Sequence, residues 1–139
     1  MKWQEELHTI LQKREGIEAF NLKRFDAITK EVIIPTFKEF KKILEEYKIP
    51  SELEMNKQPI YYIGFDKELK VEVKLDLDKI IIQIKLEHKS VSYVLDQEIE
   101  DILLLEKVIT LDEITDDFIC KTIIECFDNK YVTSYLRNN

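Results

Sequence analysis

Residues 69–95 read LKVEVKLDLDKIIIQIKLEHKSVSYVL, and this stretch decides the fold. From Leu69 to Leu77 apolar residues alternate strictly with charged ones, and from Ile80 to Leu86 apolar residues occupy the even positions. A period of two is typical of a β-strand that buries one face and exposes the other to water. We therefore predict a meander of antiparallel strands with one apolar and one charged face.

The change of parity between the first two strands predicts the turn that joins them. Apolar residues of neighbouring antiparallel strands share a face only if the loop between them has an even number of residues. A two-residue turn at Asp78-Lys79 meets this condition and sets Lys70 opposite Glu87. A four-residue loop would set Lys70 opposite Lys85, where like charges repel, so we expect the shorter turn.

Two more strands can join the apolar face of this sheet. The upstream strand needs a three-residue loop before Leu69, and the downstream strand needs a turn at Lys89-Ser90. Their core residues would be Tyr61, Ile63 and Phe65 upstream, and Val91, Tyr93 and Leu95 downstream. The outer face is charged, so the apolar face must be covered by helices on one side only.

The N-terminus predicts a short amphipathic helix from residue 2 to about residue 14. Trp3, Leu7, Ile10 and Leu11 recur at helical spacing, and Gly16 is expected to end the helix. This terminal helix can pack on its own sheet or on the sheet of a second subunit.

A longer helix is predicted over residues 22–48, with Asn21 as its N-cap and a kink or restart at Pro35. Its expected core stripe is Phe25, Ile28, Val32, Thr36, Phe40, Ile43 and Tyr47. A second stripe beside it consists of Ile33, Phe37 and Leu44. Around residues 33–37 the helix is therefore apolar over more than half its circumference, which suits either a central core position or half of a dimer interface.

The predicted fold is a two-layer α+β domain that spans the whole chain of 139 residues. Residues 51–59 are interpreted as a polar connector, and 98–114 as a short helix followed by a short strand over 107–111. One longer strand pair is the alternative there. The expected parts are a helical part over 1–48, a four- to five-stranded antiparallel meander over 60–97, the connection over 98–114 and a C-terminal helix over 115–136.

Composition restricts the classes of partner. The formal net charge is −7, and residues 96–128 carry 11 acidic and 2 basic residues, against 17 acidic and 19 basic residues elsewhere. This balance argues against general nucleic-acid binding. No apolar run reaches the roughly 18 residues of a membrane span, and the N-terminus is too polar for a signal peptide, so we expect a cytoplasmic protein without membrane contact.

The residue types that carry chemistry lack the patterns that catalysis or cofactor binding needs. Gly16 and Gly64 belong to no phosphate-binding motif, and His8 and His88 have no second ligand at metal-binding spacing. Cys120 and Cys126 lie about 9 Å apart along a predicted helix, beyond disulfide reach, and are expected to be buried apolar residues. We therefore expect no enzyme activity, no cofactor and no metal.

One acidic cluster could in principle hold a hard cation, since four carboxylates occur within six residues. It lacks the spacing and the glycine of an EF-hand loop, and helix capping explains it more simply. The cluster consists of Asp112, Glu113, Asp116 and Asp117.

We expect a non-enzymatic protein-protein interaction module, which could be an adaptor, a chaperone-like protein or an inhibitor of the immunity type. It would act as a homodimer or with a basic protein partner. The expected interaction surface combines surplus apolar residues with the acidic cluster: Trp3, Leu7, Ile33, Ile34, Phe37, Asp112, Glu113, Asp116 and Asp117.

The alternative is a carrier of a small apolar ligand. Its cavity would lie between the helix that contains Pro35 and the sheet, with a volume above about 300 Å³. The expected lining residues are Tyr61, Tyr93, Phe37 and Phe40.

Overall fold

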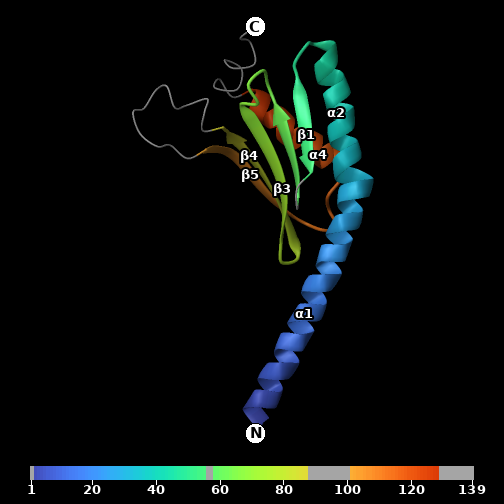
Figure 1. Cartoon of the computed structure of the whole chain (residues 1–139), viewed down its shortest axis with the longest axis vertical. Coiled ribbons are helices and arrows are strands. Elements are labelled where there is room, and N and C mark those ends of the chain that lie inside the picture. The colour runs from blue at the N-terminus through green and yellow to red at the C-terminus, as the bar shows by residue number, and fades with distance from the viewer. Residues whose placement is uncertain (1, 56–57, 88–100, 129–139) are drawn as a thin grey trace.

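The computed structural model describes residues 2–55, 58–87 and 101–128 (Figure 1). Its elements form an α+β fold with one antiparallel sheet in the order β1-β2-β3-β4-β5, which confirms the predicted fold class and meander. The elements are α1 (Lys2–Ile28), the π-helical turn η1 (Thr29–Ile33), α2 (Ile34–Glu46), β1 (Ser51–Met55), β2 (Pro59–Ile63), β3 (Leu69–Asp76), β4 (Lys79–Leu86), β5 (Ile102–Thr110) and α4 (Asp116–Phe127).

The core lies between the sheet and the helices α2 and α4, which pack on the same face. The alternating apolar residues of the strands point into it and are almost wholly buried. Strands contribute Tyr61, Ile63, Leu69, Val71, Val73, Ile80, Ile82 and Ile84, and helices contribute Ile33, Phe37, Leu44, Ile119 and Ile123. The sheet lies to one side of the rod formed by α1 and α2 (Figure 1).

The predicted register of β3 against β4 is wrong by two residues. The turn consists of Leu77 and Asp78, and Lys70 lies directly opposite Lys85, the pairing that like-charge repulsion argued against. Glu72 explains why this pairing is tolerated, since its carboxylate lies between both lysines, 3.1 Å from Lys70 Nζ and 3.5 Å from Lys85 Nζ. The parity of the loop is as predicted, so the apolar residues that remain in the two strands face the core, whereas Leu77 lies in the turn and is exposed.

The predicted stop at Gly16 is also wrong, because α1 continues through it. A single glycine in a helix interior costs about 1 kcal/mol relative to alanine, which weakens a helix without ending it. The predicted kink or restart at Pro35 is confirmed, because α1 ends at Ile28 and the α-helix resumes as α2 at Ile34, after the π-helical turn η1. The proline ring would clash with the carbonyl of Glu31 in a regular α-helix, and the wider turn η1, closed by a hydrogen bond from Ile34 N to Thr29 O, precedes it.

Two segments that were expected to be irregular or helical are strands. β1 lies within the predicted polar connector, where it pairs with β2 and forms one edge of the sheet. The described part of the segment expected to hold a short helix belongs to the nine-residue strand β5 (Ile102–Thr110), which agrees with the alternative of longer strand structure there; residues 98–100 lie outside the described residues. A register shift between Ile84 and Lys85 breaks the alternation on the β4–β5 pair and conceals the strand pattern. The predicted strand at residues 91–95 lies outside the described residues.

The C-terminal helix α4 begins where the sequence predicts. Thr115 is its N-cap and accepts a hydrogen bond from Phe118 N at 3.1 Å. Ile119, Thr122 and Ile123 face the core from this helix. Its predicted extension to residue 136 lies outside the described residues beyond Asp128.

Candidate functional site

The first 19 residues of α1 extend past the sheet into solvent (Figure 1). Every residue from Lys2 to Phe20 is exposed, and we call Lys2–Phe20 the projecting segment. At 1.5 Å per residue it is about 28 Å long. Burial of α1 begins only at Asn21 and Phe25, where the helix reaches the body of the protein.

One face of the projecting segment is apolar. Its large side chains recur at intervals of three, four and seven residues, so they form a single stripe on the helix. This α1 stripe consists of Trp3, Leu7, Ile10, Leu11 and Ile17, and both Trp3 and Ile10 are 61% exposed. Glu5 and Gln12 lie on the opposite face.

The α1 stripe continues the buried face of the same helix. The series 3, 7, 10, 14, 17 extends by the same spacing to Asn21 and Ile28, with Phe25 beside it. Asn21 and Phe25 are buried against the body, and Ile28 is half-buried. The helix therefore presents one long apolar face, of which the sheet and its turns cover only the C-terminal part.

Two polar contacts hold the helix where it leaves the body. Asn21 Nδ2 donates a hydrogen bond to the carbonyl oxygen of Leu77, at the β3–β4 turn, with a distance of 3.2 Å. One turn further, Arg24 forms an ion pair with Asp112. These contacts fix the direction in which the projecting segment points.

A groove lies between the projecting segment and the β3–β4 turn. Its volume is about 460 Å³, and its lining residues are Ile10, Lys13, Arg14, Ile17, Glu18, Asn21, Leu77 and Asp78. Leu77 is 62% exposed and has a φ of 58°, a left-handed conformation that is unfavourable for a bulky side chain. An exposed leucine in a strained turn beside an apolar helix face indicates a surface suited to a partner.

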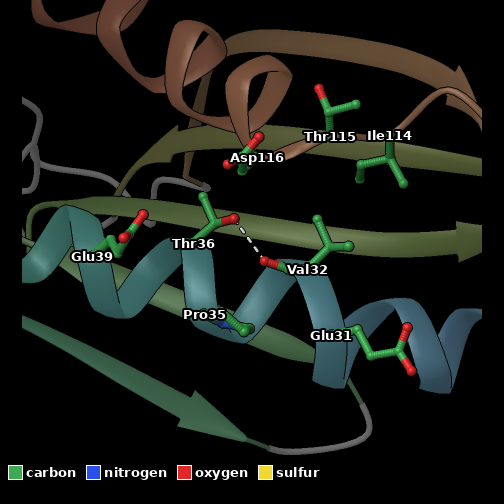
Figure 2. Close-up of a pocket in the computed structure, with 8 residues that line it drawn as sticks. All are labelled: Glu31, Val32, Pro35, Thr36, Glu39, Ile114, Thr115 and Asp116. Atoms are coloured by element: carbon green, nitrogen blue, oxygen red, sulfur yellow. Dashed lines mark hydrogen bonds between the residues drawn. The ribbon is translucent and has the colours of Figure 1, made fainter.

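A second pocket of about 450 Å³ opens between α2 and the start of α4 (Figure 2). Val32, Pro35 and Ile114 give it apolar walls, while Glu31, Glu39 and Asp116 bring three carboxylates to it. In Figure 2, Thr36 of α2 and Val32 of η1 point toward the segment that holds Ile114, Thr115 and Asp116. Its mixed and acidic lining differs from the apolar lining expected for a hydrophobic ligand.

The chain was compared with known protein families, with curated proteins and with solved structures. None of them matches. Functional inference therefore depends on the side chains and surfaces of this structure.

Of the predicted apolar interaction residues, the fold exposes only some. Trp3 and Leu7 are exposed on the α1 stripe, and Ile34 is half-buried. Ile33 and Phe37 are 0% exposed because they pack on the sheet, which corrects their predicted place on the interaction surface. The excess of apolar residues near Pro35 belongs to the core, where two adjacent faces of the helix are buried.

The predicted acidic residues are exposed and have contacts within the chain. Asp112 pairs with Arg24, and Glu113 accepts a hydrogen bond from Thr110. Asp116 accepts one from the backbone of Asp117 at the start of α4, where negative charge also complements the helix dipole. Helix capping and ion pairing account for this cluster.

The aromatic residues predicted to line an apolar cavity pack on one another instead. Phe37 stacks on Tyr61 with ring centroids 4.8 Å apart, and Phe40 meets the same ring edge-on at 6.3 Å. Tyr61 is fully buried, its hydroxyl donates to Ser51 Oγ, and burial raises its pKa to about 12. The side chains fill the space that a ligand would need; Tyr93 lies outside the described residues.

Neither cysteine has the environment of a reactive thiolate. Burial raises the pKa of Cys126 to about 11, and burial followed by the nearby Asp116 raises the pKa of Cys120. Within residues 2–55, 58–87 and 101–128, no cluster of three histidine, cysteine or acidic side chains could hold a metal ion. In the same ranges, no helix is both long and apolar enough to cross a bilayer.

Sequence reasoning missed part of the exposed apolar surface. The predicted terminal helix includes Ile10 and Leu11, but the predicted interaction surface does not. Ile17 lies outside that predicted helix, because the helix is expected to end at Gly16. The signal that identifies Ile17 is the spacing of seven residues that separates Trp3, Ile10 and Ile17. Leu77 had no such signal, because its place at the turn depends on the register of β3 and β4.

Proposed function

We propose that this protein is a non-enzymatic protein-protein interaction module and that the projecting segment is its docking element. The observation that carries the proposal is the course of α1, in which an apolar face leaves the core and continues uncovered for about 28 Å. Exposed apolar patches of this kind are typical of interaction sites.

The physical chemistry of an isolated helix supports this proposal. In proteins most helical stability comes from packing of an apolar face rather than from intrinsic helix propensity. The projecting segment contains an interior glycine, Gly16, and none of its residues is buried by the sheet. A partner that covers the α1 stripe would supply the missing stabilisation.

The charge of the segment sets it apart from the rest of the chain. Residues 2–20 contain four acidic and three basic residues, whereas the whole chain has a net charge of −7. A nearly balanced helix does not favour a strongly basic partner. Shape and apolar contact are therefore the expected basis of recognition.

A photo-crosslinking amino acid in the expressed chain tests this function. Placed at position 10, on the stripe, it should give a discrete crosslinked adduct in cells. Placed at position 12, on the polar face, it should not. Adding Leu7→Asp to the position-10 chain should remove the adduct, because a charge in an apolar interface is costly to bury. No adduct from position 10, or equal adducts from both positions, would contradict the proposal.

A further inference from the structure

We propose that the partner of the projecting segment is a second copy of this chain, bound antiparallel so that each α1 stripe covers the other. This inference rests on the proposed function and adds the identity and orientation of the partner. In the pairing, the partner's Trp3 enters the groove between α1 and the β3–β4 turn.

The position of the body selects the antiparallel orientation. The face of α1 that is bare up to Ile17 is the face that Asn21 and Phe25 bury against the body. If two copies faced each other in parallel, both sheets would occupy the same space beside the helices. Figure 1 shows that the body occupies only the C-terminal end of α1. In the antiparallel orientation each body therefore lies at the N-terminal end of the other helix, and only the groove beside the β3–β4 turn has to receive residues of the partner.

The spacing of the stripe residues matches this orientation. A twofold axis level with Gln12 sets Trp3 at the level of the partner's Asn21 and Leu7 opposite the partner's Ile17. These positions follow the alternation of three and four residues that packs two helices side by side. The exposed part of α1 ends where the body begins. In an antiparallel pair the projecting segment of one copy can therefore cover the projecting segment of the other along its whole length.

Arg14 lies at the centre of this stripe and suits a paired helix. Its Nε lies 3.0 Å from Glu18 Oε1, which neutralises its charge within the same helix. Its aliphatic part can then cover apolar surface at the level of the partner's Ile10. A single polar residue in such a seam is a known means of fixing register.

The groove at the β3–β4 turn supplies the end of the interface. Its volume of about 460 Å³ accommodates an aromatic side chain. In the antiparallel register the indole of the partner's Trp3 reaches the level of Asn21, beside the exposed side chain of Leu77. This contact gives a reason for an apolar residue in a left-handed turn, where asparagine or glycine would be less strained.

The area available is that of a stable dimer. Six exposed side chains contribute on the order of 100 Å² each, so two chains bury roughly 1,200 Å², the lower limit of standard interfaces. They are Trp3, Leu7, Ile10, Leu11, Ile17 and Leu77. The near balance of charge in residues 2–20 also means that two copies do not repel strongly.

Sedimentation of the full chain from about 1 to 200 μM tests the inference, since this range detects micromolar association. We expect a reversible dimer. Ile10→Asp should raise the dimer dissociation constant at least about 100-fold, because both subunits would bury the charge. Gln12→Asp adds the same charge on the opposite face and should change the constant by less than about threefold. A monomer throughout the range, or equal effects of the two variants, would overturn the inference.

Disulfide trapping tests the orientation. Chains with Leu7→Cys and chains with Ile17→Cys should give an interchain disulfide when mixed, while each variant alone should not. The wild-type chain controls for its native thiols. Trapping of either variant alone, without trapping of the mixture, would indicate parallel helices and overturn the proposal.

Leu77→Asn tests the dimer contact separately from the stability of the monomer. Asparagine tolerates the left-handed conformation at this turn, so monomer stability should be maintained or increased. The dimer should weaken about tenfold through loss of the apolar contact. An unchanged dissociation constant would exclude the groove as part of the interface.

The crosslinking experiment distinguishes failure of this inference from failure of the proposed function. A position-10 adduct with twice the chain mass of 16.7 kDa supports a second copy. An adduct of another mass leaves the proposed function in place and overturns the inference, whereas absence of any adduct overturns both.

Discussion

Glu72 shows how one carboxylate permits a register that simple pairing rules disfavour. It lies on the outer face of the sheet, yet its side chain is only 9% exposed. Lys70 Nζ lies 3.1 Å from Oε1 and Lys74 Nζ lies 3.0 Å from Oε2, with Lys85 3.5 Å away. Without Glu72, the like charges of Lys70 and Lys85 would repel each other. The diagonal contacts of Glu72 with both lysines offset this repulsion.

Glu72→Gln should reduce the free energy of unfolding by about 1 to 3 kcal/mol at pH 7, because three lysines lose the carboxylate between them. Urea unfolding followed by circular dichroism measures this change. Glu106→Gln on β5 is the matched control; this exposed residue accepts one hydrogen bond from Gln83 and should cost less than about 1 kcal/mol. Equal losses in both variants would contradict a special role for Glu72.

The same carboxylate predicts a pH dependence. Burial acts to raise the pKa of Glu72, but hydrogen bonds from Lys74 and Lys70 outweigh it and hold the pKa below the ordinary 4.5. A lowered folded-state pKa gives stability that is complete above pH 4.5 and is lost as pH falls through the folded-state value. The difference in unfolding free energy between wild type and Glu72→Gln should therefore shrink below pH 4.5. A difference that is constant from pH 7 to pH 3 would contradict this assignment.

At the scale of elements, the end of α2 depends on one residue. Ile49 N donates to Leu44 O and Lys48 N donates to Glu45 O, both at 3.0 Å, which is the Schellman pattern of a helix C-terminus. Lys48 takes the left-handed position of this motif with a φ of 60°. Glycine occupies that position without strain.

Lys48→Gly should therefore raise the free energy of unfolding by about 0.5 to 1 kcal/mol. Thermal and urea unfolding measure the gain, and Lys42→Gly, in the interior of the same helix, should show a loss of similar size. A loss at position 48 would mean that the side chain of Lys48 contributes more than its backbone strain costs.

Gly16 gives a matching test in α1. An added Cβ would meet no atom within 4 Å, so Gly16→Ala introduces no clash. The substitution should increase the helix signal of the projecting segment, because alanine favours the helix by about 1 kcal/mol over glycine. Circular dichroism at low protein concentration measures it, where self-association contributes least. An unchanged signal would indicate that packing already holds this segment fully helical.

The sequence predicted elements well wherever local patterning decides them. The alternation in residues 69–86 and the capping threonine at 115 are local signals, and both elements form as expected. The predicted helix end at Gly16 was wrong, because the modest free-energy cost of one glycine does not end a helix that has favourable residues on both sides. β5 was obscured by an irregularity that exists only when β4 and β5 are paired.

The candidate site was predictable only in part, for the same reason. Trp3 and Leu7 carry a helical pattern and were identified. Ile33 and Phe37 carry an equally good pattern, and only the fold shows that the sheet covers them. Leu77 joins the site through the register of a hairpin, which depends on the contacts of Glu72 on the far side of the sheet.

At the scale of the whole molecule, the body and the projecting segment have separate sources of stability. The core cluster contains no residue before Phe25, so the sheet, α2 and α4 hold together without the first part of α1. The α1 stripe is instead exposed, and the proposed dimer would supply its apolar contacts. Stability of the body without the projecting segment should be independent of protein concentration, whereas the order of that segment and the stability of the full chain should rise with concentration.

Removal of residues 2–17 tests this division. At low micromolar concentration the shortened chain should unfold with a free energy within about 1 kcal/mol of the full chain, because every removed residue is exposed. At higher concentration the full chain should gain stability, since dimer formation stabilises the folded state by mass action, while the shortened chain should not. Thermal unfolding over a 100-fold range of concentration measures both. A melting temperature of the full chain that does not depend on concentration would contradict self-association, and a large loss in the shortened chain at low concentration would show that the projecting segment supports its own body.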